Sequence, residues 1–177
     1  VWLYFDSNNN LKLLCTNASV AVGTLLTTQV FRDSSAWYHI VLAVDTTQGT
    51  ASNRLKIYVN GEQTTSFGTA TYPSQNTDLQ LNNNVLTRLG ILTWSLLHPF
   101  DGYMSEVNFI DGLALTPTSF GEFKNGAWIS INTSGLTFGT NGFRLKFDQV
   151  GVGTASTSTI GADSSGKDTL RHWTSTA

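Results

Sequence analysis

The acidic residues of this 177-residue sequence do not form the pairs that acid–base catalysis requires. Glu106 is the carboxylate in the interior of the longest expected extended segment, and the nearest others, Asp101 and Asp111, each lie five residues away near the ends of that segment. Hydrolysis of a glycosidic bond needs two carboxyl groups held roughly 5–10 Å apart on either side of the bond. We therefore expect Glu106 to be held by backbone groups or by an arginine, because a buried charge needs such partners. The protein is not expected to be an enzyme.

The histidines and the single cysteine are too scattered to build a nucleophile with its base, or a zinc site. His39 lies in a core-like segment, His98 lies in a loop, and His172 lies near the C-terminus. No nucleophile elbow or oxyanion motif surrounds them, and they do not form a zinc-ligand constellation. We expect His39 to be a hydrogen-bonded structural histidine and Cys15 to be a small buried apolar residue.

Sugar binding is the chemistry that the remaining residue types favour. An exposed aromatic ring can stack on a sugar, and amide side chains can bind its hydroxyl groups. Trp94 and His98 share one loop, and Asn83 and Asn84 precede that loop. We predict that these four residues form a rim that binds a glycan or a protein partner. The alternative is that Trp94 and the leucines beside it plug one end of the fold or dock onto a neighbouring subunit, because they would form an apolar patch in so polar a chain.

The composition predicts a neutral surface that forms hydrogen bonds. Only 12% of the residues are charged, the net charge is −2, and Ser, Thr, Asn and Gly together make up 72 residues. No block of like charges is present, so nucleic acid is not an expected partner. The 20 aromatic residues exclude a disordered chain. Apolar runs such as 40–44 are far shorter than the ~20 residues that cross a bilayer.

Short strands have to position these residues, because helical periodicity is nearly absent. A run without polar alternation, 37–44, is expected to be covered on both faces and central in its sheet. Residues 54–59 alternate between apolar and polar, and the Asn60-Gly61 pair behind them favours a two-residue hairpin turn, since both positions prefer a positive φ. The tryptophans expected in the core are Trp2, Trp37 and Trp128.

Further strands follow from the same signals. They are predicted at 1–6, 11–16, 19–31 with Gly23 as a potential break, 62–67, 79–81 paired with 85–91, 100–110 and 143–148. One short helical turn is expected at 116–122, where a proline follows a hydroxyl cap. About ten short strands at this spacing predict an all-β fold, an antiparallel β-sandwich or jelly roll.

The order of three segments resembles the concanavalin A-like, laminin-G-like jelly roll. Residues 37–45 match a strand with Trp and His before an apolar run, 55–61 match a hairpin ending in Val-Asn-Gly, and 100–107 match a strand with Phe-x-Gly before Glu-Val. An Ala-Leu-Thr-Pro turn at 114–117 completes the pattern, and the resemblance covers 1–122. It implies an antiparallel β-sandwich of a type that hosts lectins, adhesins and hydrolases, so the fold alone does not choose a function.

A narrower resemblance extends toward the C-terminus, to laminin-G-like structural proteins of tailed bacteriophages, particularly marine ones. The parts that carry it are 100–123, Trp128, 139–143 and 163–166. In that group a Gly-x-Asp-x-Ser-Gly segment precedes an Asn and a Trp. Asp163, Gly166 and Trp173 match this pattern, whereas Asp168 or Thr169 stands where Asn is usual.

The resemblance also implies domain limits and an open edge. A laminin-G-like β-sandwich domain is predicted over 1–148, followed by an extended Gly-, Ser- and Thr-rich segment, 149–177. Domains of this kind begin some strands upstream of Val1. The fold is therefore expected to lack its N-terminal strands, or to complete an open edge with a neighbouring chain, which would make the protein oligomeric.

Calcium is the cofactor that relatives often bind at a loop rim, through Asp and Asn side chains and backbone carbonyls. Asp45, Asp78, Asp101 and residues 82–84 supply such oxygens here. No spacing selects ligands among them. No cofactor is expected, and calcium stays an open alternative.

These observations favour a non-enzymatic virion structural protein of a phage, as a tail fibre, an appendage or a capsid-decorating domain. Such a protein would pack on other virion proteins or on copies of itself, with host-surface glycans as a further ligand. Its expected location is the virion, and neither nucleic acid nor a membrane is an expected partner. The alternative is a carbohydrate-binding module of a secreted bacterial protein.

Overall fold

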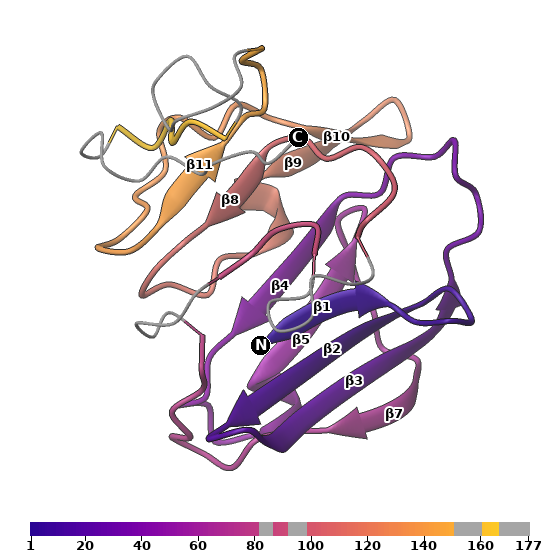
Figure 1. The fold of residues 1–177 in the computed structure, drawn as a ribbon, viewed down its shortest axis with the longest axis vertical. Helices are drawn as coiled ribbons and strands as arrows, with labels where there is room; N and C mark the ends of the chain where they lie inside the picture. Colours follow the sequence, from indigo (N-terminus) through magenta and orange to yellow (C-terminus); the bar gives the residue numbers. More distant parts are fainter. Residues whose placement is uncertain (82–86, 92–98, 151–160, 167–177) are drawn as a thin grey trace. The chain divides into compact units, whose positions relative to one another are not determined.

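Antiparallel strands build the described part of the chain (Figure 1), which in the computed structural model comprises residues 1–81, 87–91, 99–150 and 161–166. The strands are β1 (Trp2–Phe5), β2 (Asn10–Asn17), β3 (Val20–Val30), β4 (Ile40–Val44), β5 (Leu55–Val59), β6 (Glu62–Gln63), β7 (Phe67–Thr71), β8 (Val107–Phe109), β9 (Gly121–Lys124), β10 (Ala127–Ser130) and β11 (Phe143–Leu145). Two 3₁₀ turns accompany them, η1 (Ala51–Asn53) and η2 (Pro117–Ser119). The predicted all-β class is confirmed, and η2 confirms the expected helical turn.

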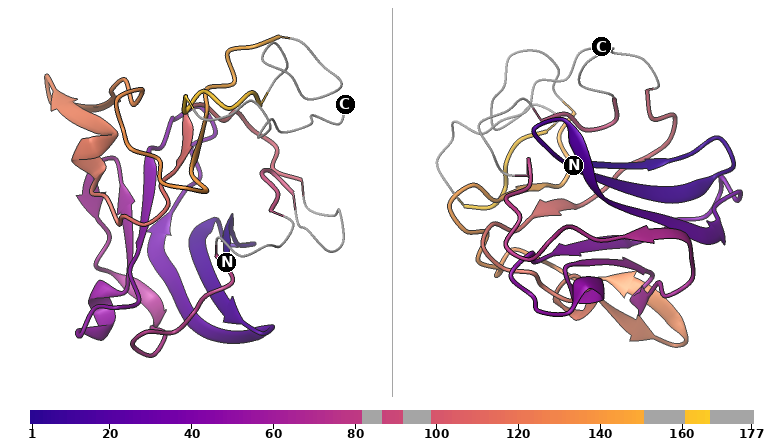
Figure 2. Two further views of the ribbon diagram at one scale, coloured as in Figure 1. Left: turned by 90° about the vertical axis from the view of Figure 1, so that its left-hand side faces the viewer. Right: turned by 90° about the horizontal axis from the view of Figure 1, so that it is seen from below.

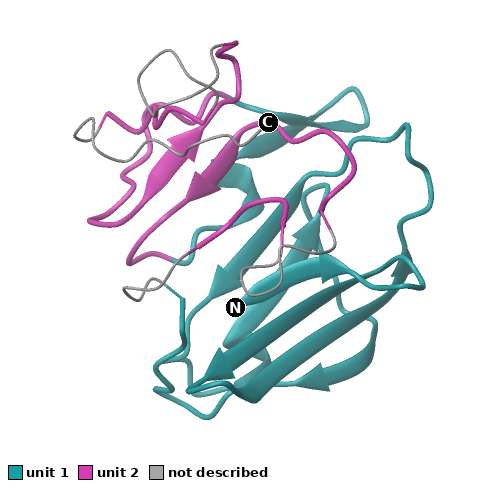
Figure 3. Cartoon of the chain, in the orientation of Figure 1, with its two compact units in different colours: residues 1–85, 114–131 teal, residues 86–113, 132–177 magenta. Residues whose placement is uncertain are grey.

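The chain forms two compact units (Figure 3). Unit 1 consists of residues 1–85 and 114–131, and unit 2 of residues 86–113 and 132–177. The predicted domain limits, 1–148 and 149–177, stay a prediction. In the described ranges no helix is long and apolar enough to span a membrane.

Unit 1 is a two-layered sandwich with one apolar core. One sheet has the strand order β1-β2-β3-β7 and the other β4-β5-β6, and Figure 2 shows the indigo strands β1 to β3 in one layer and the purple β4 and β5 in the other. Side chains from both sheets meet in a single buried cluster, as the face-to-face packing of sheets requires. Its members are Leu11, Leu13, Cys15, Leu25, Phe31, Leu55, Ile57, Val59 and Leu79. Burial raises the pKa of the Cys15 thiol to about 11, as expected for a buried cysteine.

The alternation of side chains along the strands decides which residues enter this core. Leu13 on β2 stands opposite Leu3 on β1 and Leu25 on β3, so the three side chains share one face of the sheet. β3 runs through Gly23 without a break. A Cβ atom at Gly23 would come within 3.0 Å of a side-chain carbon of Leu55, so glycine lets the second sheet approach closely.

The segment predicted as a central strand, 37–44, differs from the structure in its start and its place. β4 begins at Ile40, and in the described residues it pairs only with β5, so it ends the β4-β5-β6 ladder. Both of its faces are covered, as predicted, since Val41 and Ala43 are buried and the residues between them half-buried. Trp37 precedes the strand with 66% of its surface exposed. Its predicted place in the core is therefore wrong, because the chain has not yet entered the sheet at this residue.

The predicted Asn60-Gly61 turn is confirmed, and the ring of Trp128 packs against it. Asn60 and Gly61 have φ values of 49° and 85°, in the region that type I′ turns need. A side chain at Gly61 would collide with the ring of Trp128, which also lies against Gly121. Trp128 is half-buried between these two glycines.

A second hairpin of the same kind, β9 with β10, was not among the predicted strands. Its turn is Asn125-Gly126, with φ values of 53° and 80°. The dipeptide is the same signal as Asn60-Gly61, but the flanking residues are exposed on most positions and show no apolar alternation. The sequence at this hairpin therefore has the turn signal but lacks the alternation of apolar and polar residues that marks a strand.

Several other predicted strands are shorter or missing in the described residues, and those predicted at 62–67 and 143–148 are reduced to β6 and β11. Positions 79–81 and 87–91 contain no strand, although Leu79 is buried in the core, and 82–86 lie outside the described residues. Of the long segment 100–110 only β8 is a strand, and it pairs antiparallel with β11 in unit 2. The backbone turns before β8, because Glu106 has a φ of 52°.

Candidate functional site: a side cleft in unit 1

The rim predicted from the sequence lies outside the described residues. This holds for all four of its members, Trp94, His98, Asn83 and Asn84. The rim therefore stays a prediction, and the site that can be built from geometry lies elsewhere in unit 1.

A cleft opens where β6 ends after two residues. β6 pairs with β5 only through Gln63 opposite Tyr58 and Glu62 opposite Val59. The N–H of Thr64 still donates to the carbonyl of Ile57 at 2.9 Å, and the chain then crosses to β7 in the other sheet. The first half of β5 is left without a neighbour on that side among the described residues.

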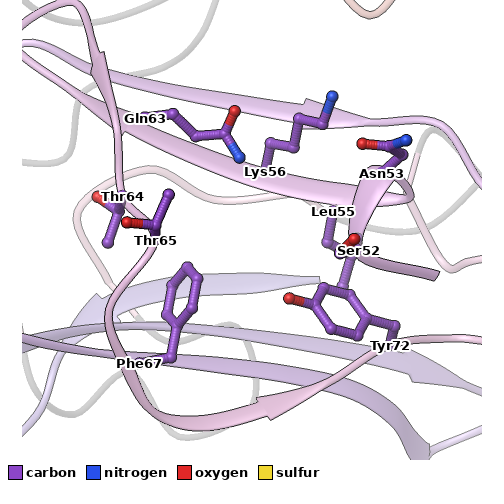
Figure 4. Close-up of a pocket in the computed structure, with 9 residues that line it drawn as sticks. All are labelled: Ser52, Asn53, Leu55, Lys56, Gln63, Thr64, Thr65, Phe67 and Tyr72. Atoms are coloured by element: carbon purple, nitrogen blue, oxygen red, sulfur yellow. The ribbon is translucent and has the colours of Figure 1, made fainter. Parts of the chain in front are cut away.

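The space beside this half of β5 is a cavity of about 230 Å³ (Figure 4). Both sheets, η1 and the chain between β6 and β7 contribute to it. Its lining residues are Ser52, Asn53, Leu55, Lys56, Gln63, Thr64, Thr65, Phe67 and Tyr72. Sites for drug-sized ligands usually occupy ~300–1,000 Å³, so this cleft suits a ligand no larger than about one or two sugar rings.

The aromatic side chains and the long polar side chains lie on opposite sides of β5. Figure 4 shows the rings of Phe67 and Tyr72 on one side of β5, and the side chains of Asn53, Lys56 and Gln63 on the other. The two rings also pack against the buried apolar cluster, which restricts their movement. The rings therefore do not face these amide and ammonium groups, and the polar groups on their own side of β5 are hydroxyl groups such as those of Ser52 and Thr65.

The side chain of Arg54 forms hydrogen bonds that hold together the chain segments around the cleft. Its Nε donates to the carbonyl of Gln48, its Nη2 to that of Gly49 and its Nη1 to that of Pro73, each at 2.8 Å. Pro73 directly follows Tyr72, and Arg54 directly follows Asn53. The guanidinium therefore ties the segment that carries the aromatic wall to the turn that carries one of the polar groups.

The described lining residues of the cleft include no Asp or Glu. Glycoside hydrolysis by the usual mechanism needs two carboxyl groups on opposite sides of the bond. What the lining offers instead is stacking surface, hydroxyl groups and amides.

Glu106, the carboxylate singled out in the sequence, is held by an arginine, as predicted. Arg144 donates to it twice, from Nε at 3.0 Å and from Nη2 at 3.1 Å. The side chain of Arg144 is 7% exposed and that of Glu106 30%. Such a bidentate ion pair is strong and restricts the geometry of both side chains. Glu106 therefore has a structural role in unit 2.

The prediction that the side chain of His39 is hydrogen-bonded is wrong for its Nδ1 atom. Its Nδ1 is buried and has no hydrogen-bond partner within the described structure, and the same is true of Nε1 of the neighbouring Trp128. The two rings lie 5.7 Å apart, centre to centre. Burial lowers the pKa of His39, because it disfavours the charged form. The hydrogen bond at this residue is instead made by its backbone N–H, to Oδ1 of Asn60 at 2.8 Å.

No group of three or more His, Cys, Asp or Glu side chains that could hold a metal ion occurs in the part of the chain that the structure describes. Among the oxygens considered for calcium, the carboxylate of Asp45 accepts hydrogen bonds from Thr47 and Gln48 at 2.6 Å each. The hydrogen bond from the Thr47 hydroxyl is the largest cause of the lowered pKa of Asp45, and the bond from Gln48 lowers this pKa further. Residues 82–84 lie outside the described residues, and calcium binding stays a prediction.

Comparison with known proteins decides the family. Residues 1–119, more than half of the chain, match a family model described as the concanavalin A-like lectin/glucanases superfamily. The chain belongs to this superfamily. No significant match was found among curated proteins or among solved structures. Membership confirms the predicted concanavalin A-like fold and indicates a carbohydrate-binding or adhesion-type domain, in a superfamily whose name covers both sugar-binding and sugar-cleaving proteins.

Proposed function

We propose that this chain is a non-enzymatic adhesion domain that binds carbohydrate in the side cleft of unit 1. The observation that carries the proposal is the lining of the cleft. It combines the rings of Phe67 and Tyr72 with hydroxyl groups such as those of Ser52 and Thr65, and it includes no carboxylate among the described lining residues. Membership of a superfamily of lectins and glucanases supports the same ligand class.

The composition supports recognition through neutral groups. Charged residues make up 12% of the chain, and the net charge is −2. A sugar presents hydroxyl groups and one apolar ring face, so hydroxyl- and amide-rich walls with an aromatic surface complement it. Binding does not require a metal ion in this proposal, because none of the described lining residues is a preferred calcium ligand of the carboxylate type.

Removal of Tyr72 tests the site. The protein is screened against a panel of immobilised oligosaccharides, and the best ligand is titrated by calorimetry with and without a chelator. Tyr72→Ala should weaken binding about five- to thirtyfold, since one stacking ring and its hydroxyl group contribute roughly 1–2 kcal/mol. The chelator should leave the affinity unchanged.

Two further variants keep this test decisive. Tyr103→Ala removes an aromatic ring that is 88% exposed in unit 2 and is not among the lining residues of the cleft, so this variant should bind like the wild type. Thr65→Ala removes an exposed cleft hydroxyl group without touching the core, so it should fold normally even if Tyr72→Ala does not. Full affinity in both cleft variants, or the absence of any glycan ligand for the folded protein, would refute the site.

We further propose that the domain acts on a tailed-phage particle, as a fibre, appendage or decorating protein. The resemblance of its C-terminal part to phage structural proteins supports this role. So does an apolar edge in unit 1: Leu3 and Phe5 of β1 stand opposite Leu13 and Leu11, on the core side of the sheet, yet are 42% and 36% exposed. Contact with another virion protein or a second copy of the chain would cover them.

Particle association separates this role from the alternative. The side cleft would serve equally well in a carbohydrate-binding module of a secreted bacterial protein. Mass spectrometry of density-purified particles should find the chain at constant stoichiometry, and light scattering of the full-length product should show an oligomer. Recovery from bacterial culture fluid free of particles, as a monomer, would favour the secreted module.

A further inference from the structure

The chain contains three Asn-Gly pairs, and the structure places them in different surroundings. They are Asn60-Gly61, Asn125-Gly126 and Asn141-Gly142. An asparagine before a glycine can react with its own backbone, because glycine has no side chain that hinders the approach of its nitrogen to the asparagine carboxamide. The reaction needs a carboxamide that is free to turn and a glycine N–H that water can reach.

The first pair, Asn60-Gly61, does not meet these conditions. Oδ1 of Asn60 accepts the backbone N–H of His39 at 2.8 Å, and the backbone N–H of Asn60 donates to the carbonyl of His39, also at 2.8 Å. A Cβ atom at Gly61 would collide with the ring of Trp128. The carboxamide is therefore held toward His39, and the glycine is covered by the indole.

The pair Asn141-Gly142 is protected at its glycine. Gly142 is buried, and a Cβ atom there would collide with the backbone carbonyls of Phe138 and Phe109. The backbone N–H of Asn141 donates to Oδ2 of Asp111 at 2.9 Å, which holds the residue before the glycine in place. The nitrogen that would have to attack is thus shielded from the water that must remove its proton.

The pair Asn125-Gly126 meets both conditions. The two residues form the turn between β9 and β10, and both are exposed. The side chain of Asn125 has no hydrogen bond to a described residue, and nothing lies within 4 Å of a Cβ atom built at Gly126. β9 and β10 pair only with each other among the described residues, so this turn can open without disturbing the buried cluster.

We propose that Asn125 is a site of spontaneous conversion to aspartate and isoaspartate in the folded protein, and that the fold protects Asn60 and Asn141. The deprotonated nitrogen of Gly126 attacks Cγ of Asn125, the new N–Cγ bond closes a cyclic imide, and the Cγ–Nδ2 bond breaks to release ammonia. Water then opens the imide at Cγ to give aspartate, or at the backbone carbonyl carbon to give isoaspartate. The net reaction exchanges an amide and water for a carboxyl group and ammonia, and nothing is oxidised or reduced.

The products change the hairpin that holds Trp128. Both add a negative charge to the turn, and isoaspartate also lengthens the backbone by one carbon atom. The turn depends on two successive residues at positive φ, here 53° and 80°. Isoaspartate should therefore disturb the pairing of β9 with β10. This inference is independent of any ligand in the side cleft.

Peptide mapping by mass spectrometry tests the proposal. The full chain is incubated in its folded state at mildly alkaline pH, and in parallel in urea until the denatured chain has converted about half of its Asn-Gly pairs. In the folded protein Asn125 should convert at least about tenfold faster than Asn60 and Asn141, because these two react only after the structure around them opens. In urea the three rates should be similar, since the dipeptide is the same and no fold protects it.

A turn variant identifies the reacting group. Asn125→Gly keeps the turn, because glycine adopts a positive φ readily, and it removes the carboxamide. Labelling by an isoaspartyl methyltransferase should detect isoaspartate in the β9–β10 peptide of the wild type and none in that of the variant. Conversion of Asn60 or Asn141 as fast as that of Asn125 in the folded protein would overturn the proposal. So would an intact Asn125 in the folded protein after the denatured chain has reacted.

Discussion

The two units of the chain are stabilised by different kinds of contact. The described part of unit 1 has nine buried apolar residues in one cluster between two sheets. Among its described residues, unit 2 has one short strand pair, β8 with β11, on which the rings of Phe109 and Phe143 stack at 5.5 Å. Phe138, Leu145 and Ala162 are also buried in unit 2, together with the polar contacts of the buried Arg144. The comparison teaches that one superfamily domain can combine a region with a large apolar cluster and a region in which fewer buried apolar residues are joined by charge and hydrogen bonds.

The polar contacts of unit 2 form a connected network. The guanidinium of Arg144 donates hydrogen bonds to both carboxylate oxygens of Glu106 and to Oδ1 of Asn132, the last at 3.4 Å. Asp163 accepts the N–H of Arg144 at 3.0 Å and that of Ser165 at 2.9 Å, so it joins residues 161–166 to β11. Networks of this kind specify one arrangement, but they are sensitive to the loss of any member.

The largest effect is expected from a cavity in unit 1. Leu13 is completely buried between the sheets. Leu13→Ala should destabilise the protein by about 3–4 kcal/mol, because it removes apolar contacts and leaves a cavity. Chemical denaturation measures the change, and the loss should be nearly independent of salt. A loss below about 1 kcal/mol would mean that unit 1 does not depend on this core.

The smaller expected loss comes from breaking the ion pair of unit 2. Arg144→Met leaves the partly buried Glu106 without its partner and should cost about 2 kcal/mol, less than for a fully buried pair because Glu106 is 30% exposed. Amide exchange should accelerate at Leu145 and Ser164 and stay slow at Leu13 and Leu25 in unit 1.

The double variant sharpens this result. Glu106→Gln together with Arg144→Met removes both charges and should recover part of the stability lost in Arg144→Met alone, since no unpaired carboxylate remains. Faster exchange throughout unit 1 in the single variant would show that the two units do not differ in what stabilises them.

The same difference explains how much of the molecule could be predicted from its sequence. The strands of unit 1 repeat apolar residues at every second position, so β2, β3 and β5 and the Asn60-Gly61 turn were found at nearly the right places. The polar network joins positions 106, 132, 144 and 163, which are far apart in the chain and follow no period. Sequence reasoning identified only one of its contacts, an arginine or backbone partner for Glu106.

The side cleft escaped prediction for a related reason. It exists because β6 stops after Gln63, where the sequence suggested one strand over 62–67. Thr64 and Thr65 have strand propensities as high as those of their neighbours. Where a strand leaves its sheet is decided by the crossing to β7, and no local pattern records that crossing. The Trp94 rim was a reasonable prediction from residue type, and it lies outside the described residues.

The smallest effect is expected from pH, and it concerns unit 1. Burial lowers the pKa of His39 below its ordinary value of 6.5, so the unfolded chain takes up the proton more readily than the folded one. Stability from the neutral ring is therefore fully present above about pH 6.5 and is lost as the pH falls through the folded pKa. Unit 1 therefore contains a titratable group, His39, next to the ring of Trp128, and protonation of this group destabilises the fold.

His39→Phe isolates this contribution from that of the carboxylates. Phenylalanine keeps an aromatic ring beside Trp128 but cannot be protonated, and it removes the buried Nδ1 that lacks a hydrogen-bond partner in the described structure. The difference in unfolding midpoint between pH 7 and pH 5 should be smaller in the variant than in the wild type, because His39 no longer contributes to it. An identical pH dependence in the two proteins would show that His39 is as accessible to protons in the folded state as in the unfolded one, and that unit 1 is stabilised without regard to charge.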